Sequence, residues 1–226
     1  MYEQLSKYYN QLFKFNTQLN EFLAPFVTAN HQAIDLGCGT GRLTKLISDL
    51  GMNVSGIDLD EHMIEEAKKS YPYLEFKVEN MLDSMKNKQF DLITCFGNTL
   101  VHLNLIQLNL LFERVAKSLS KKGYFIIQIL NYDSILKNKP QTLKELNTDH
   151  IKLIRKYDYL PEFIRFETEL HVNHDIISGF THLYPYQIHE LIQIIQSFQL
   201  KVEIYGDLKM NAVSEHSEYI YMVINP

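Results

Sequence analysis

The chain is poor in cysteine, in long apolar runs and in positive charge, and each shortage narrows what it can be. Its two cysteines, Cys38 and Cys95, argue against a disulfide framework and favour a reducing, cytoplasmic compartment. No apolar run approaches the roughly 20 residues of a membrane span, and the N-terminus lacks the basic and apolar regions of a secretory signal. A net charge of −5 argues against a nucleic-acid partner.

The chain also lacks internal repeats and low-complexity linkers. Its 226 residues are enough for one domain with a large core and a small inserted subdomain. An apolar fraction of 46% and a charged fraction of 22% describe an ordinary globular protein. We therefore expect a cytoplasmic monomer or homodimer that has neither a membrane nor a nucleic acid as its partner.

The most informative segment that is present runs from Ala33 to Gly41 and reads Ala-Ile-Asp-Leu-Gly-Cys-Gly-Thr-Gly. The apolar run, the repeated glycines and the amphipathic stretch that follows predict a strand, a tight turn and a helix. Glycine lets a ligand lie against bare main chain, and the next helix offers its N–H groups to a polar ligand. A second apolar strand ends at Asp58, where an acid in such a unit meets a ribose hydroxyl. Together they predict an adenosine-type cofactor at the carboxyl ends of a parallel sheet.

The glycine spacing separates two kinds of cofactor. A dinucleotide loop has the form G-x-G-x-x-G. Gly37 and Gly39 fit this form, but Arg42 stands at the third position and the third glycine is Gly41. Gly41 falls within the turn, so we expect no glycine to support the close helix–strand contact of a dinucleotide fold. An NAD-dependent oxidoreductase is therefore the less favoured alternative.

Hydrophobic periodicity predicts alternating strands and helices. Asp60 is the predicted N-cap of one helix, and Lys121-Lys122-Gly123 is the predicted stop of another. Helices are expected twice within residues 1–28, at 40–50, 61–70 and 104–119, and from Pro185 onward. Strands are expected at 31–36, 52–58, 73–78, 90–96, 124–130, 200–205 and 219–223.

Residues 131–184 interrupt this order. After a polar stretch at 131–148, three segments with alternating apolar residues predict strands at 150–157, 163–172 and 176–184. A turn is expected at Asn173-His174-Asp175. This insert follows the fifth strand of the sheet, where the ligands of open α/β sheets bind. We predict a core of residues 1–130 and 185–226, and an inserted β subdomain of residues 131–184 that caps the substrate.

Several of these segments resemble one family. The pattern Asp35-Leu-Gly-Cys-Gly-Thr-Gly resembles motif I of the class I S-adenosylmethionine (SAM) methyltransferases. Gly-Ile-Asp58-Leu-Asp resembles their ribose motif, Glu-Asn80-Met-Leu their adenine segment, and Phe90–Phe96 their fourth strand. The segment Gly97–Leu103 is similar to small-molecule members such as the glycine and sarcosine N-methyltransferases. The resemblance covers roughly residues 31–130 and 185–225. One departure is Asn80. The family often has the charged residue Asp at this position, whereas Asn is an uncharged amide.

The resemblance implies a fold and an activity. The fold is a Rossmann-like seven-stranded, mostly parallel sheet with an antiparallel last strand and helices on both faces. The activity is transfer of a methyl group from SAM to a small molecule, more readily to nitrogen than to oxygen, with S-adenosylhomocysteine as product. A non-catalytic SAM-binding protein is the other alternative. The implied cofactor residues are Tyr9, Asp35, Gly37, Cys38, Gly39, Gly41, Asp58, Leu59, Asn80, Met81, Phe96 and Gly97.

The acceptor side is less defined by the sequence. His102 lies just beyond the fourth strand, and its ordinary pKa suits a base or a group that positions the acceptor. The residues expected to meet the substrate are Asn98, Tyr132, Arg155 and Arg165. For each of these a structural role, as a packed ring, a hydrogen-bonded histidine or a solvated charge, stays open. His171 and His174 stand an odd step apart in a predicted strand and face opposite ways, so we expect no metal.

Overall fold

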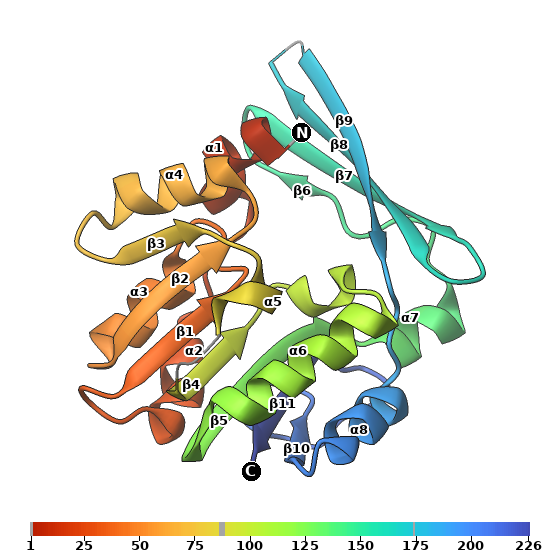
Figure 1. The fold of residues 1–226 in the computed structure, drawn as a ribbon. Coiled ribbons are helices and arrows are strands. Elements are labelled where there is room, and N and C mark those ends of the chain that lie inside the picture. Colours follow the sequence, from red (N-terminus) through yellow and green to blue (C-terminus); the bar gives the residue numbers. More distant parts are fainter. Residues whose placement is uncertain (1, 86–88, 174) are drawn as a thin grey trace.

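The computed structural model describes residues 2–85, 89–173 and 175–226, and a seven-stranded sheet forms its centre (Figure 1). The strand order is β10-β11-β5-β4-β1-β2-β3. Strands β1 to β5 pair in parallel, whereas β11 is antiparallel to both of its neighbours. This confirms the predicted Rossmann-like sheet. Its strands are β1 (Gln32–Leu36), β2 (Asn53–Asp58), β3 (Glu75–Val78), β4 (Phe90–Cys95), β5 (Leu119–Leu130), β10 (Lys201–Tyr205) and β11 (Tyr219–Asn225).

Helices cover both faces of this sheet because its central strands are apolar on both sides. Leu92 of β4 packs in the cluster beneath α2 and α3, and its neighbour Ile93 packs in the cluster beneath α6 and α8. Both side chains are fully buried. The helices are α1 (Tyr2–Leu12), α2 (Leu19–Leu23), α3 (Arg42–Asp49), α4 (Glu61–Ser70), α5 (Met81–Ser84), α6 (Leu105–Ser118), α7 (Tyr132–Asn138) and α8 (Ile188–Ser197), with short 3₁₀ helices η1 (Ala24–Phe26) and η2 (Thr99–His102).

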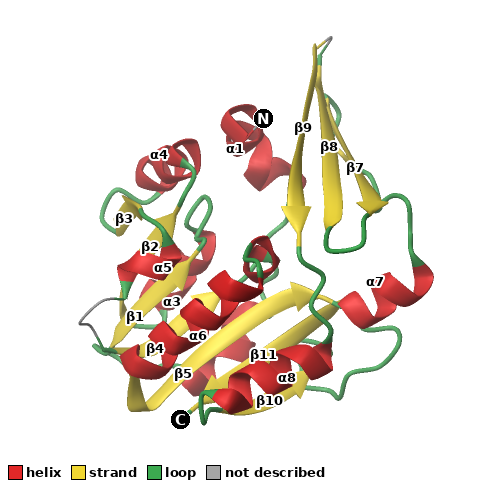
Figure 2. Ribbon diagram, turned by 45° about the vertical axis from the view of Figure 1, so that its right-hand side comes forward, coloured by secondary structure: helices red, strands yellow, loops and turns green. Residues whose placement is uncertain are grey.

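A second, four-stranded antiparallel sheet stands over the edge at which β1, β2 and β4 end (Figures 1 and 2). We call it the cap sheet. Leu5 and Leu12 of α1 pack against Ile151, Leu153 and Leu170 of this sheet, and α1 also contacts α4. The first helix therefore joins the cap sheet to the glycine-loop side of the molecule. The strands of the cap sheet are β6 (Leu146–Asn147), β7 (Ile151–Tyr159), β8 (Ile164–Val172) and β9 (Asp175–Leu183).

Of three helix boundaries predicted from the sequence, one is confirmed and two are wrong. Asp60 caps α4 as predicted, because its Oδ1 accepts a hydrogen bond from Met63 N at 3.0 Å. The predicted stop at residues 121–123 is wrong: α6 ends at Ser118, Leu119 is already extended, and the two lysines and the glycine lie inside β5. Pro185 does not open the last helix, which begins at Ile188 behind a capping box.

The segment 131–148 is more ordered than its polar composition suggests. It contains α7, which the sequence did not predict. Asn131 Oδ1 accepts a hydrogen bond from Ser134 N at 3.2 Å and so caps this helix, while Tyr132 is 1% exposed. The predicted turn before β9 includes His174, which lies outside the described residues. Among the described helices, none is both long and apolar enough to cross a membrane.

Candidate functional site

The loop after β1 and the acid at the end of β2 are hydrogen-bonded to each other. Gly39 N donates to Asp58 Oδ2 at 2.9 Å, and Asp60 N donates to Asp58 Oδ1 at 2.9 Å. The two strands run in parallel with Leu36 opposite Ile57, so both loops leave the same edge of the sheet. A carboxylate offers about four lone-pair positions, so Asp58 retains acceptor capacity for a ligand. Burial raises the pKa of Asp58 above its usual value.

The three glycines of the loop all have positive φ, but the space beside them differs. A Cβ on Gly37 would lie 2.4 Å from Thr99 Cγ2, and one on Gly41 would lie 2.6 Å from Phe76 Cζ. A Cβ on Gly39 would meet no atom within 4 Å. Gly37 and Gly41 are therefore required by the protein's own packing. Gly39 leaves a place where a ligand can approach bare main chain.

A close helix–strand contact is present, contrary to the expectation from the loop alone. A Cβ on Gly56 of β2 would lie 2.8 Å from Thr44 Oγ1 of α3 and 2.9 Å from Cys38 Sγ. The glycine that allows the contact is thus in the strand rather than in the loop. The spacing of the loop glycines gives no information about this glycine in β2.

Asp35 lies beneath the loop and is 1% exposed. Its Oδ1 accepts a hydrogen bond from Thr94 Oγ1, and its Oδ2 accepts one from Thr44 Oγ1, both at 2.8 Å. Burial raises the pKa of Asp35 to about 6, although the two hydroxyl donors act in the opposite direction. Cys38 and Cys95 are buried nearby, and burial also raises the pKa of both thiols. These residues support the loop from inside the sheet.

The residues expected near an adenine lie at the next strand ends. Leu59 follows Asp58 and is 66% exposed, an apolar side chain with room for a flat ring beside it. Asn80 Oδ1 accepts from Leu82 N at 2.9 Å and thereby caps α5. The amide N–H groups of Asn80 are then the part that can meet an adenine edge. Met81 is mostly buried and belongs to the main core.

The loop after β4 is held in place by β5. Gly97 N donates to Gln128 Oε1 at 2.7 Å, and Asn98 N donates to Gln128 O at 3.2 Å. Asn98 has a positive φ of 63°. Its Oδ1 accepts from Leu130 N at 3.1 Å, and its Nδ2 donates to Tyr132 Oη at 2.9 Å. The structure therefore brings two of the predicted substrate residues, Asn98 and Tyr132, into direct contact.

Helix α1 brings Tyr9 close to the glycine loop and to the cap sheet. The ring of Tyr9 lies 4.5 Å from the ring of Phe13, centroid to centroid, and Arg42 Cζ lies 5.7 Å from its centroid. Burial raises the pKa of Tyr9, and charges on Arg42, Asp58 and Arg155 act on it as well. Tyr9 therefore lies beside Arg42, which directly follows the glycine loop, and beside Phe13, whose ring is near Arg155 of the cap sheet.

The two predicted arginines of the insert lie on opposite faces of the cap sheet. Arg155 shares its face of β7 with Leu153, which packs against α1. We call this the inner face. Arg165 lies on the other face, where its Nη2 is 3.3 Å from Glu167 Oε1 and its guanidinium lies 4.4 Å from the centroid of the exposed Phe180 ring. The structure therefore brings Arg155, but not Arg165, toward the other predicted site residues.

Phe96 and His102 lie at the margins of this group. The Phe96 ring is 6.3 Å from the ring of Tyr221, centroid to centroid, and its carbonyl accepts from Thr99 Oγ1 at 2.6 Å. His102 ends η2, and its Nδ1 lies 3.4 Å from Thr181 Oγ1 of β9. Partial burial by the surrounding chain lowers the pKa of His102, although the residue as a whole is exposed. Its ring is therefore neutral at pH 7.

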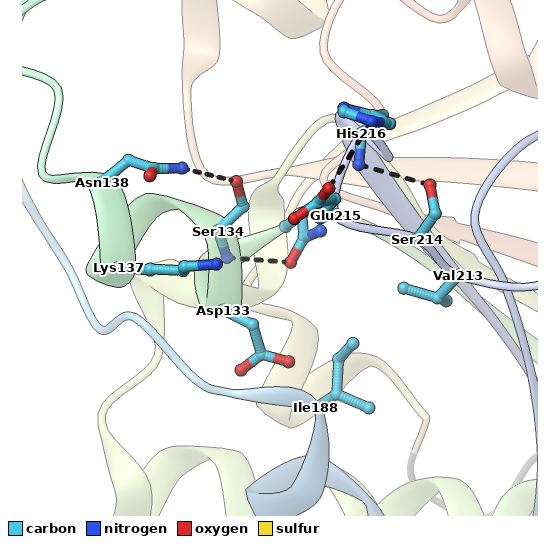
Figure 3. A pocket seen from close by; sticks show the side chains of 10 residues that line it. Asp133, Ser134, Lys137, Asn138, Ile188, Val213, Ser214, Glu215 and His216 are labelled. Atoms are coloured by element: carbon cyan, nitrogen blue, oxygen red, sulfur yellow. Dashed lines mark hydrogen bonds and ion pairs between the residues drawn. The ribbon is translucent and has the colours of Figure 1, made fainter.

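A separate pocket lies between α7 and residues 213–216 (Figure 3). It has a volume of about 470 Å³ and is lined in part by Asp133, Lys137, Glu215 and His216. None of its lining residues was predicted to bind the cofactor or the acceptor. Across residues 2–85, 89–173 and 175–226, no group of three or more His, Cys, Asp or Glu residues is placed to hold a metal.

Sequence reasoning missed the polar residues that support the loops from within. Thr94 and Gln128 are polar residues within the apolar runs 92–96 and 124–130, and both are buried. Such residues need hydrogen-bond partners inside the fold, so their isolation was a usable signal. Thr44 gave no such signal, because a threonine in an amphipathic helix is ordinary.

These contacts define an α/β domain whose glycine loop and neighbouring acid lie together at one edge of the parallel sheet. Residues 33–123 match the family model described as a methyltransferase domain. Trans-aconitate 2-methyltransferase of Rhizobium etli is 34% identical over 100 residues, which cover 43% of this chain and 38% of that protein. Glycine N-methyltransferase of Mus musculus is 26% identical over 124 residues, which cover 47% of this chain and 42% of that protein.

Solved structures share the whole architecture. A SAM-dependent methyltransferase from Clostridium acetobutylicum superposes with a TM-score of 0.86 at 18% identity, covering 99% of this chain and 98% of that one. The chain spans less than half the length of the curated relatives that it matches in sequence. Residues 33–123 thus resemble a methyltransferase domain, and the chain as a whole has the fold of a solved SAM-dependent methyltransferase.

Proposed function

We propose that this chain is an enzyme that uses SAM to methylate a small molecule and releases S-adenosylhomocysteine. The observation that supports this most is the open space beside Gly39, next to a carboxylate that retains acceptor capacity. The match of residues 33–123 to a methyltransferase domain supports it independently. Trans-aconitate and glycine, which the names of two relatives specify, are small molecules.

The cofactor would lie along the carboxyl edge of β1, β2 and β3. Asp58 would accept hydrogen bonds from the ribose hydroxyls, and Leu59 would cover the adenine. When bound, SAM supplies a methyl group on a positively charged sulfur. The residues proposed to hold it are Tyr9, Gly37, Gly39, Asp58, Leu59, Asn80, Met81, Phe96 and Gly97, supported from within by Asp35, Cys38 and Gly41.

Nitrogen is the favoured acceptor atom. Burial raises the pKa of the Tyr132 and Tyr157 hydroxyls, which therefore stay protonated at neutral pH and cannot remove a proton from an acceptor. A neutral amine already carries a lone pair, so positioning and the exclusion of water are enough. An oxygen acceptor would need a base, and His102, neutral at pH 7, is the candidate for it. Residues 131–184 would cap the acceptor.

Calorimetry with SAM, S-adenosylhomocysteine and NAD tests the cofactor. We expect both SAM and its product to bind with a dissociation constant at least tenfold below that of NAD. Incubation with SAM and a panel of small amines, hydroxyl compounds and carboxylates, followed by mass detection of S-adenosylhomocysteine, tests the activity. Preference for NAD would establish the oxidoreductase alternative. SAM binding without product formation on any member of the panel would favour the non-catalytic alternative.

A further inference from the structure

The inner face of the cap sheet carries a cation that no carboxylate of the described chain neutralises at close range. Among the described residues, no acidic oxygen forms an ion pair with Arg155. Its Nη2 donates to Lys144 O at 2.7 Å, its Cζ lies 5.8 Å from the Phe13 ring centroid, and its Nε is buried without a hydrogen-bond partner. A guanidinium has five N–H donors, so most of its capacity is unused.

A second unused donor lies beside it. Tyr157 is two residues further along β7 and therefore on the same face as Arg155. It is 3% exposed, and its Oη is buried without a hydrogen-bond partner. Burying a hydroxyl without a partner is unfavourable, so such a group points to a ligand that completes its hydrogen bonding. A planar cation and a neutral O–H donor on one face match the lone pairs of an oxyanion.

Both groups lie on the side of the cap that approaches the proposed cofactor edge. Arg155 Cζ lies 5.8 Å from the Phe13 ring centroid, and the Phe13 ring lies 4.5 Å from that of Tyr9. Tyr9 in turn lies beside Arg42, which directly follows the glycine loop. On the other side, Tyr157 belongs to the same apolar cluster as Tyr132, whose hydroxyl accepts from Asn98. Arg155 thus lies near side chains that lead to the glycine loop, and Tyr157 packs in the cluster that includes Tyr132 beside the loop after β4.

We propose that Arg155 and Tyr157 bind an oxyanion group, a carboxylate or a phosphate, that belongs to the methyl acceptor. This rests on the function proposed above and specifies its substrate class: a small molecule with an acceptor atom and, at a fixed distance from it, a negative charge. Arg155 fixes the anion and Tyr157 fixes its orientation, so that the acceptor atom is positioned toward Gly97 and Asn98.

Two other groups compete with the acceptor's anion as partners for Arg155. Glu218 is the acidic residue that acts on Arg155 electrostatically, but it is exposed and forms no ion pair with it. The carboxylate of SAM itself is the second. Arg42 is the cation that lies next to Tyr9 and directly follows the glycine loop, so we assign the cofactor's amino-acid end to Arg42 and the acceptor's anion to Arg155.

Lys156 provides a matched control. It is the next residue of β7, carries the same charge, and lies on the outer face in an ion pair with Glu169 at 2.7 Å. Arg155→Gln and Lys156→Gln therefore remove one positive charge each, one residue apart, from opposite faces. Tyr157→Phe removes only the unpartnered hydroxyl and keeps the ring.

The first measurement follows the arginine Nε–Hε signals by NMR while sodium acetate or inorganic phosphate is added to the protein saturated with S-adenosylhomocysteine. The signal missing from Arg155→Gln identifies the residue. We expect this Arg155 signal to shift saturably with acetate or with phosphate. The anion that shifts the signal at the lower concentration identifies the bound group as a carboxylate or a phosphate. Lys156→Gln should leave the titration unchanged, and Tyr157→Phe should weaken it severalfold. No shift with either anion overturns the proposal, whatever the enzyme does with SAM.

The second measurement uses pairs of acceptors that differ only in a carboxylate and its neutral amide. We expect the wild type to prefer the carboxylate member, and Arg155→Gln to lower kcat/KM for it by roughly tenfold to a hundredfold while SAM affinity changes less than twofold. Equal loss on both members, or loss of SAM affinity in Arg155→Gln, would assign the arginine to packing or to the cofactor and overturn the proposal. If no acceptor is methylated at all, it is the proposed function that fails, and the NMR result still decides this site.

Discussion

The sheet edge and the cap sheet satisfy their polar groups in opposite ways. At the sheet edge, both oxygens of Asp35 and both oxygens of Asp58 accept hydrogen bonds from the protein itself. On the inner face of the cap, Tyr157 Oη and Arg155 Nε are buried without partners. A site whose groups are already paired is built before the ligand arrives, and here Asp58 keeps acceptor capacity for that ligand. A site with unpaired donors gains its hydrogen bonds from the ligand, and so selects for it.

The two regions also differ in what they are made of. The sheet edge relies on backbone: the open main chain at Gly39, the N–H groups around Asp58, and the loop held by Gln128. The cap relies on side chains that project from one face of a β-sheet. Backbone geometry tolerates few substitutions, whereas side chains on a sheet face can change singly. This division suits an enzyme with a fixed cofactor and a particular acceptor.

The strongest test of the backbone side is Gly39→Val. The new side chain meets no protein atom within 4 Å of its Cβ, so it would fill the space proposed for the cofactor. We expect SAM binding to fall below detection by calorimetry, with a stability loss of about 1–3 kcal/mol from the positive φ. Gly51→Ala is the control, since Gly51 also has a positive φ but lies after α3; it should lose stability and keep SAM affinity. Wild-type affinity in Gly39→Val would show that the loop does not approach the ligand.

Leu170→Ala tests whether the cap is a separate unit, as the predicted insert of residues 131–184 requires. Leu170 is fully buried in the cluster that joins the cap sheet to α1. The cavity should cost about 2–5 kcal/mol, expressed as faster hydrogen exchange in α1 and β7–β9 with β1 and β4 unchanged. Leu111→Ala, in the main core, should instead speed exchange throughout. If the two variants show the same exchange pattern, cap and core are one cooperative unit.

Asp58→Ala tests the hydrogen bonds proposed between the sheet edge and the cofactor. Loss of hydrogen bonds to a charged acceptor is worth about 1.5–3 kcal/mol, so SAM should bind roughly tenfold to a hundredfold more weakly. Asp60→Ala should remove the N-cap of α4 at a cost of about 1 kcal/mol in stability and leave SAM affinity within twofold. Unchanged SAM affinity in a folded Asp58→Ala protein would remove the ribose assignment.

The smallest effect is expected at Asp35. Its pKa in the folded protein is raised to about 6 from 3.8 in a model peptide, so protonation favours the folded state. The stabilisation is fully present below about pH 4 and is lost as pH rises through about 6, which amounts to about 1 kcal/mol between pH 5 and pH 7. Urea unfolding of wild type and Asp35→Asn across this window measures it: the variant should lack this part of the slope. Parallel pH profiles would show that Asp35 does not titrate in this range.

The sequence predicted much of the sheet edge because the signals there are local. Motif spacing and apolar runs give the order of strands and helices, and Asp60 was recognised as a cap from the residues beside it. The signals that failed depend on distant partners. Lys121, Lys122 and Gly123 look like a helix stop, but they lie inside β5, in an irregular part of its pairing with β4 between Leu119 and Tyr124. Gly56 allows a contact with α3 that no pattern in the loop could indicate.

The sequence by itself determined the edge of the sheet proposed for the cofactor: a glycine loop, an acid at the next strand end, and a parallel sheet, all set by short-range backbone preferences and hydrophobic periodicity. Tertiary structure alone decided the face proposed for the acceptor. Arg155 and Arg165 are the same residue type in adjacent strands, and the pairing of β7 with β8 places them on opposite faces, where Arg165 meets Glu167 of its own strand. Side chains alternate between the faces of a sheet, so which face is inner depends on what packs against it, here α1 from the far end of the chain.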